Sequence, residues 1–200
     1  MVAIGWQYGT SMNQYGLDEF VAQCRSVAAA NADPADCVIA IAPLMERLLE
    51  GARSFIRPEH LRADPDHYAR NAIYIAPDQQ LSLFALVWLP GQWTPVHDHG
   101  SWGVVGVLQG VLEERSLMAI DGELTADHGI RLKRGGVLLL KEKSISSFVP
   151  NPDHIHMTGV SQTRETAVTL HLYGRNMNSF HIYDVEKGTR SLVDVPHQAT

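Results

Sequence analysis

Residues 91–99 read Gly91-Gln92-Trp93-Thr94-Pro95-Val96-His97-Asp98-His99, directly after an apolar run over residues 81–89. Because a strand places residues i and i+2 on one face, His97 and His99 can direct their imidazoles at one point. Imidazole is a ligand for iron, zinc, copper and nickel. Two polar residues on one strand face can also simply point to solvent. The pair therefore indicates a metal site if a third histidine further along the chain completes it.

The bulk properties of the chain disfavour several classes of protein. Its 200 residues, of which 45% are hydrophobic, are enough for one domain with a substantial core, and we expect a single domain over residues 1–200. The formal net charge of -6 disfavours nucleic acid or an anionic membrane as a partner. The sequence shows no signal-peptide pattern and no apolar run of transmembrane length. The two cysteines, Cys24 and Cys37, form no CxxC motif, so we expect buried structural thiols and a cytoplasmic location.

The hydrophobic pattern of the sequence changes near residue 70. Residues 17–66 have mostly helical spacing of apolar residues, with Asp33-Pro34 as the expected start of a second helix and Gly51 as its end. Residues 70–187 consist of short apolar or alternating runs between turn residues, which predicts an antiparallel barrel or sandwich. We expect Gly135-Gly136 to be one of the turns and residues 188–200 to form a loosely attached tail. The expected strands are residues 70–76, 81–89, 95–98, 102–109, 111–120, 137–140, 145–149, 155–160, 166–174 and 180–185.

The spacing Gly-x5-His-x-His, followed by Gly110 after another strand, resembles the first motif of the cupin superfamily. This resemblance implies a mainly β, jelly-roll-like barrel, here with N-terminal α-helices. Most cupins carry a glutamate ligand shortly after the second histidine, where this chain has Gly103 and Val104. The nearest acids downstream are Glu113 and Glu114. The missing carboxylate disfavours the common site of two histidines and one carboxylate.

A third histidine ligand is expected between residues 151 and 160. His154 and His156 again have the i, i+2 spacing. His156 begins a run that resembles a strand, whereas His154 follows a Pro-Asp turn. We therefore expect His156 to be the ligand and His154 to lie at the rim, although both could be surface histidines.

At this point the chain resembles the cysteine dioxygenase family, a branch of the cupins, over most of residues 60–175. The resemblance rests on four motifs in order: Tyr68-Ala69-Arg70-Asn71, Pro95-x-His97-Asp98-His99, His156, and Thr169-Leu170-His171-Leu172-Tyr173. It implies that His97, His99 and His156 bind Fe(II), and that the enzyme adds both atoms of O2 to a thiol sulfur to give a sulfinic acid. Three neutral imidazoles leave the charge of Fe(II) uncompensated, which favours a bound thiolate.

The resemblance also implies roles for residues around the metal. Arg70 binds the carboxylate of the substrate, and Tyr68 supports it or lines the pocket. In the triad, His171 holds Tyr173, whose hydroxyl faces O2 or the substrate, and Thr169 replaces the usual serine. Arg70 could instead be a surface residue, and the triad could be a hydrogen-bonded polar stripe lining the barrel. Gly103 stands where the mammalian enzyme has a cysteine crosslinked to the tyrosine, so we expect no Cys-Tyr thioether.

The substrate is less closely defined than the reaction. Arg70 is typical of members that act on cysteine, so we expect conversion of L-cysteine to cysteine sulfinic acid. Members that act on 3-mercaptopropionate have an arginine shortly after the tyrosine, and this chain has Arg175 there. Two arginines in one pocket would suit mercaptosuccinate. A metal-binding cupin sensor without turnover and another cupin enzyme remain alternatives, and the oligomeric state stays open.

Overall fold

The computed structural model describes residues 15–120, 126–150 and 154–195, which form two α-helices, two short 3-10 helices and ten strands. None of the described helices combines the length and apolar character needed to cross a membrane. The helices are α1 (Leu17–Ala30), α2 (Pro34–Glu50), η1 (Ala52–Ser54) and η2 (Pro58–Leu61). The strands are β1 (Ala69–Ile75), β2 (Ser82–Trp88), β3 (Gly103–Gln109), β4 (Val111–Ala119), β5 (Leu132–Lys141), β6 (Ile145–Phe148), β7 (Ile155–Gly159), β8 (Ala167–Tyr173), β9 (Ser179–Asp184) and β10 (Thr189–Asp194).

The second helix starts and ends where the sequence predicts. The side chain of Asp33 accepts a hydrogen bond of 2.8 Å from the backbone N–H of Ala35, and Pro34 occupies the first turn. The helix ends at Gly51, whose N–H donates to the carbonyl of Arg47. Cys24 and Cys37 lie in the two helices as buried free thiols, as expected.

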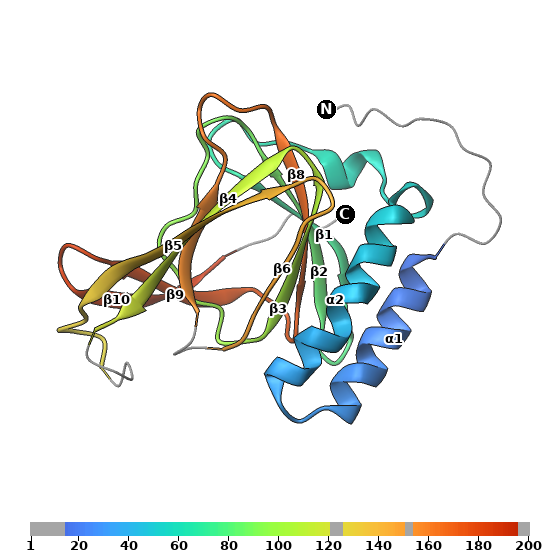
Figure 1. Ribbon diagram of the computed structural model, residues 1–200, viewed down its shortest axis with the longest axis horizontal. Coiled ribbons are helices and arrows are strands. Elements are labelled where there is room, and N and C mark those ends of the chain that lie inside the picture. The colour runs from blue at the N-terminus through green and yellow to red at the C-terminus, as the bar shows by residue number, and fades with distance from the viewer. Residues whose placement is uncertain (1–14, 121–125, 151–153, 196–200) are drawn as a thin grey trace.

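The strands form two layers of antiparallel sheet with the helices against the outer face of one layer (Figure 1). The first layer has the order β1-β2-β8-β3-β6. The second contains the sheets β5-β4-β7 and β9-β10. His97 joins these two sheets through isolated bridges to His156 of β7 and Ile182 of β9. The mainly β, jelly-roll-like fold with N-terminal helices is confirmed, although the sheets do not close into a complete barrel.

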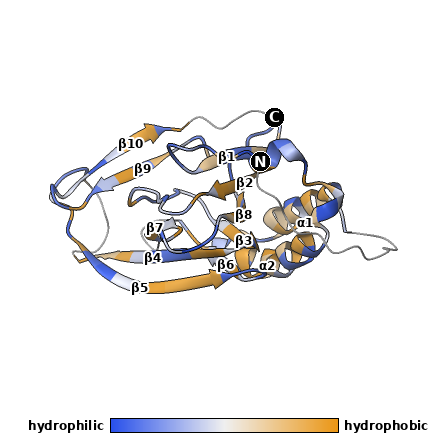
Figure 2. Ribbon diagram, turned by 90° about the horizontal axis from the view of Figure 1, so that it is seen from above, coloured by the Kyte–Doolittle hydropathy of each residue, from blue (hydrophilic) through white to orange (hydrophobic). Residues whose placement is uncertain are grey.

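Both faces of the first layer are buried, because the helices cover one face and the second layer covers the other. Every residue of β2 and β8 is buried. Alternate residues of β2 point in opposite directions: Leu83 packs in the cluster under the helices, and Phe84 packs in the cluster between the layers. Figure 2 shows the apolar side of α2 turned toward this sheet. The polar residues of β8 therefore point into the space between the layers.

Three sequence predictions about strands were wrong. Residues 95–98 form bridges rather than a continuous strand. Gly135-Gly136 lie inside β5 and not in a turn, because the register with β4 shifts there and leaves both glycines opposite Ser116, as in a β-bulge. The predicted tail contains β10, which pairs along its whole length with β9. Residues 196–200 of that tail lie outside the described residues.

Candidate metal centre and active site

Three buried histidines from distant parts of the chain converge between the layers. The backbones of His97 and His156 exchange hydrogen bonds of 2.8 and 3.0 Å, and this bridge holds His97 beside β7. The ring centroids of His97, His99 and His156 lie 4.6 to 4.9 Å apart. Each ring offers a nitrogen within 4.8 Å of the nitrogens offered by the other two. The structure thus brings together all three predicted ligands.

The three imidazoles are neutral and can each offer a nitrogen lone pair to a metal. Burial, followed by the neighbouring imidazoles, lowers the pKa of His97 and His99 well below the usual value, and burial lowers the pKa of His156 to about 4. His97 directs Nδ1 at the carbonyl of Pro95, 3.0 Å away. His99 Nδ1 and His156 Nε2 are buried and have no hydrogen-bond partner among the described residues. Buried nitrogens without partners are costly, and a transition metal would satisfy them, so these residues fit such an ion.

Glu114 lies directly behind this group, and the sequence reasoning did not assign it a role. Its Oε1 is 2.9 Å from His154 Nε2 and 3.2 Å from His156 Nδ1. Burial alone would raise the pKa of this carboxyl group, but the hydrogen bonds with the two histidines hold it well below the usual range. Strand alternation gives the signal that could have located it, since Leu112 and Glu114 share the buried face of β4.

His154, expected at the rim, is half-buried and bonds to Glu114 rather than to the three-histidine group. Glu114, His154 and His156 form a second group of side chains close enough together to hold a metal ion. The two groups share His156. The structure therefore offers two arrangements for a metal, one with three imidazoles and one with a carboxylate.

The predicted triad lies on the inner face of β8. Thr169 Oγ1 is 2.8 Å from His171 Nε2, and His171 Nδ1 is 3.3 Å from the Tyr173 hydroxyl. Trp88 of β2 extends this chain, because its Nε1–H donates to Thr169 Oγ1 at 2.9 Å. Burial lowers the pKa of His171 to about 3 and raises that of Tyr173 above its usual value. The triad is thus neutral and already connected by hydrogen bonds.

Arg70 enters the same space from β1. Its side chain is buried, with Nη2 donating to the carbonyl of Met177 at 2.5 Å and Nη1 donating to the carbonyl of Val195 at 3.5 Å. Its guanidinium carbon is 5.0 Å from the centroid of the Phe84 ring. Arg70 is therefore an interior cation and not a surface residue. Tyr68 stacks on Trp88, with ring centroids 4.7 Å apart.

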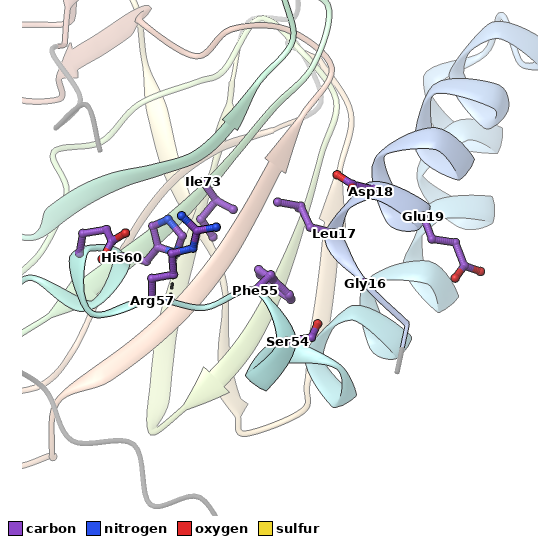
Figure 3. A pocket seen from close by; sticks show the side chains of 10 residues that line it. Gly16, Leu17, Asp18, Glu19, Ser54, Phe55, Arg57, His60 and Ile73 are labelled. Atoms are coloured by element: carbon purple, nitrogen blue, oxygen red, sulfur yellow. Dashed lines mark hydrogen bonds between the residues drawn. The ribbon is translucent and has the colours of Figure 1, made fainter. Parts of the chain in front are cut away.

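One small cavity joins these groups. The volume open to the centre of a water molecule is about 20 Å³, space for roughly one water. Its lining consists of Tyr68, Arg70, Leu86, Trp88, Thr94, His97, His99, His156, Thr158, His171, Tyr173, Met177 and Phe180. A larger cavity of about 620 Å³ is lined by none of the three candidate ligand histidines and lies between the start of α1 and the η1–η2 region (Figure 3). It brings together none of the predicted site residues.

Of the predicted site residues, Thr169 does not line the small cavity, and neither does Arg175. Its Nε donates to the carbonyl of His99 at 3.3 Å, and Nη2 donates to the carbonyl of Ser179. Arg175 therefore contacts the backbone of His99, a candidate ligand, without lining the cavity. A role in substrate binding stays a prediction.

Gly103 of β3 lies directly opposite Tyr173 of β8 in the strand register. A Cβ atom at position 103 would overlap the ring of Phe148, which stacks on His99 with centroids 4.1 Å apart. The position at which the family resemblance places the crosslinking cysteine is thus adjacent to the tyrosine in the strand register. Here an aromatic ring fills that space.

Comparisons with known proteins give several distant structural neighbours and one matching family. A protein of Thermus thermophilus shares 16% identity, with 60% of this chain and 97% of that chain covered and a TM-score of 0.44. A protein of Klebsiella pneumoniae with a double-stranded beta-helix domain shares 14% identity, with 68% and 92% covered and a TM-score of 0.42. A cupin-like protein of Thermotoga maritima shares 12% identity, with 70% and 89% covered and a TM-score of 0.41. The family model described as cysteine dioxygenase type I matches residues 10–186, which include both helices and every candidate site residue. The chain belongs to the cysteine dioxygenase type I family.

Proposed function

We propose that the protein is a non-haem Fe(II) thiol dioxygenase that converts L-cysteine to cysteine sulfinic acid. The observation that carries the proposal is the convergence of three neutral imidazoles, those of His97, His99 and His156, on one cavity. Family membership supports the broader class of oxygen-using, metal-dependent oxidoreductases. The thiol and one O2 give the sulfinic acid, so the sulfur loses four electrons and no external reductant is required.

His97, His99 and His156 would hold the metal. Bound Fe(II) would supply a Lewis acid for the thiolate and a redox centre for O2. The three residues contribute no negative charge of their own, so they leave the attraction of the site for a thiolate intact. A metal with only three protein ligands would also have room for a substrate that binds through more than one atom.

Arg70 is proposed to bind the carboxylate of the substrate. Its side chain is buried at a position that lines the cavity, and two of its N–H groups bond to the carbonyls of Met177 and Val195. The remaining N–H groups are enough for a bidentate contact with a carboxylate. Because Arg70 is buried and anchored by those carbonyls, it would fix the position of the sulfur relative to the histidines.

Tyr173 is proposed to donate a hydrogen bond to the reacting groups. Trp88 Nε1–H only donates, so Thr169 Oγ1 accepts from it. We propose that the Thr169 hydroxyl in turn donates to His171 Nε2, so that the neutral His171 carries its proton on Nδ1, facing Tyr173. With the Tyr173 oxygen accepting from His171, its own O–H is left to point into the cavity. The chain of hydrogen bonds thus orients one donor.

A second candidate substrate class is suggested by Arg175. This cation bonds to the carbonyl of His99, on the outer side of a candidate ligand. After a movement of its side chain, Arg175 could bind the second carboxylate of mercaptosuccinate. It could also bind the single carboxylate of 3-mercaptopropionate. The three thiols are therefore compared directly.

The test is oxygen uptake by the Fe(II)-loaded protein with cysteine, 3-mercaptopropionate and mercaptosuccinate in parallel. We expect uptake only with a thiol present, highest kcat/KM for cysteine, and a sulfinic acid carrying two labelled atoms from isotopic O2. His156→Ala serves as the control without a complete set of ligands. Thiol-independent uptake, or a product that is only a disulfide, would contradict the proposed function. A preference for either other thiol would correct the substrate and keep the reaction.

A further inference from the structure

The three-histidine group has a buried carboxylate behind it. Glu114 is 9% exposed at its side chain, and its Oε1 contacts ring nitrogens of both His154 and His156. Its Oε2 accepts a hydrogen bond of 3.4 Å from the Ser146 hydroxyl. An acid buried this deeply must be paired to be stable, and here it is paired entirely with the residues around the candidate metal centre.

We propose that Glu114 is a positioning residue that fixes the tautomer of His156 and keeps the metal in the three-histidine site. The proposal rests on the proposed function for the identity of that site. It assigns a purpose to a carboxylate on β4 in a chain that lacks the glutamate of most cupins on β3. It also assigns His154 the task of holding Glu114 away from the metal.

The tautomer follows from the geometry. A carboxylate accepts hydrogen bonds and cannot donate them, so His156 Nδ1, at 3.2 Å, must carry the proton. The lone pair is then on Nε2, the buried nitrogen that has no hydrogen-bond partner among the described residues. His97 is arranged in the same way, with Nδ1 directed at the carbonyl of Pro95. Glu114 thus aims the lone pair of His156 at the other two rings, and its negative charge strengthens that ring as a donor.

His154 explains why the carboxylate does not itself reach the metal. Its Nε2 holds Glu114 Oε1 at 2.9 Å. The His154 ring stacks on Phe148, with centroids 4.6 Å apart and planes 4° apart, and Phe148 stacks in turn on His99. This stack fixes His154, and His154 together with Ser146 fixes both oxygens of Glu114. Glu114 therefore supplies the negative charge that a ligand glutamate would bring, but it does so through His156 and without binding the metal itself.

The test measures metal binding in the absence of thiol and O2. Co(II) serves as a stable probe, titrated into metal-free full-length protein against a chelator. We expect Glu114→Gln to weaken binding about 10- to 100-fold, because the amide loses the charge and its NH2 group favours the wrong tautomer of His156. Glu113→Gln is the matched control: Glu113 is the neighbouring acid on the other face of β4, bonded to Arg115, and its replacement should leave affinity unchanged. His154→Phe, which keeps an aromatic ring on Phe148, should produce a smaller loss than Glu114→Gln.

Two results would overturn the proposal. Unchanged Co(II) affinity in Glu114→Gln would show that the carboxylate does not act on His156. A loss as complete as that of His156→Ala, together with a changed Co(II) visible spectrum, would make Glu114 a ligand rather than a positioning residue.

A measurement on the unmodified chain avoids dependence on variants that fold poorly. Nitrogen-15 NMR of the metal-free protein should show His156 with its proton on Nδ1, and a proton on Nε2 would refute the inference. Because none of these measurements uses a thiol, a failure of the proposed dioxygenase reaction would leave the result on Glu114 interpretable.

Discussion

Replacement of Arg70 by glutamine tests whether Arg70 binds the carboxylate of the substrate or only stabilises the fold. Two guanidinium N–H groups bond to the carbonyls of Met177 and Val195, which leaves others for the substrate. A hydrogen bond to a charged group contributes about 1.5–3 kcal/mol, so loss of two such bonds to a carboxylate should cost about 3 kcal/mol or more. This corresponds to a fall of roughly 100-fold or more in kcat/KM for cysteine.

The assay compares oxygen uptake with cysteine and with cysteamine, which has the same thiol and amine but no carboxylate. Arg70→Gln should lower kcat/KM for cysteine far more than for cysteamine, and mainly through KM. Arg175→Gln is the matched control, since Arg175 also donates to backbone carbonyls but does not line the cavity. Equal losses for both thiols in Arg70→Gln would refute a contact with the carboxylate and leave Arg70 a structural residue.

Three further predictions concern Tyr173, Gly103 and His171. Tyr173→Phe should lower kcat by about tenfold, the equivalent of one net hydrogen bond of about 1.4 kcal/mol, with little change in KM; an unchanged kcat in oxygen-uptake kinetics would exclude the hydroxyl from the reaction. Gly103→Cys should lower the free energy of unfolding by about 1–3 kcal/mol, because the added side chain overlaps Phe148; a denaturant melt equal to that of the wild type would show that Phe148 moves freely. Since burial lowers the pKa of His171 from 6.5 to about 3, the unfolded chain binds a proton that the folded protein excludes between these values, and stability should fall as pH drops through this window. Between pH 7.5 and 4.5 the contribution of His171 is on the order of 2–3 kcal/mol, and an equal fall in His171→Asn would contradict it.

The inner face of β8 shows what could be predicted from sequence. Thr169, His171 and Tyr173 alternate with apolar residues, and period two alone places all three on one side of a strand. Their convergence with Arg70 was expected only through a family resemblance. The register explains it, because Arg70 pairs with Leu86 and Leu86 pairs with Thr169. Such pairing joins residues that are far apart in the chain, so no local pattern contains it.

The wrong strand predictions and the unassigned Glu114 also depend on pairing between segments that are far apart in the chain. The histidines of residues 97–99 share a site, but the segment is held by bridges to β7 and β9 and not by a strand of its own. None of the residues of β10 is buried, so their pairing with β9 leaves little hydrophobic pattern in the sequence. Glu114 was overlooked because the family pattern directs attention to β3. Its inward position on β4 was readable from its spacing to Leu112, whereas its contact with His154 and His156 depends on how β4 pairs with β7.

The central claim is that one metal ion is bound by the imidazoles of His97, His99 and His156 and by no carboxylate. The most direct test is an anomalous difference map, recorded at the iron edge, from crystals of the Fe(II)-loaded protein grown without oxygen. The account predicts one strong peak within about 2.0–2.3 Å of a nitrogen of each of these three rings, with Glu114 still bonded to His156. A peak between Glu114, His154 and His156, or a carboxylate oxygen at bonding distance from the iron, would contradict it.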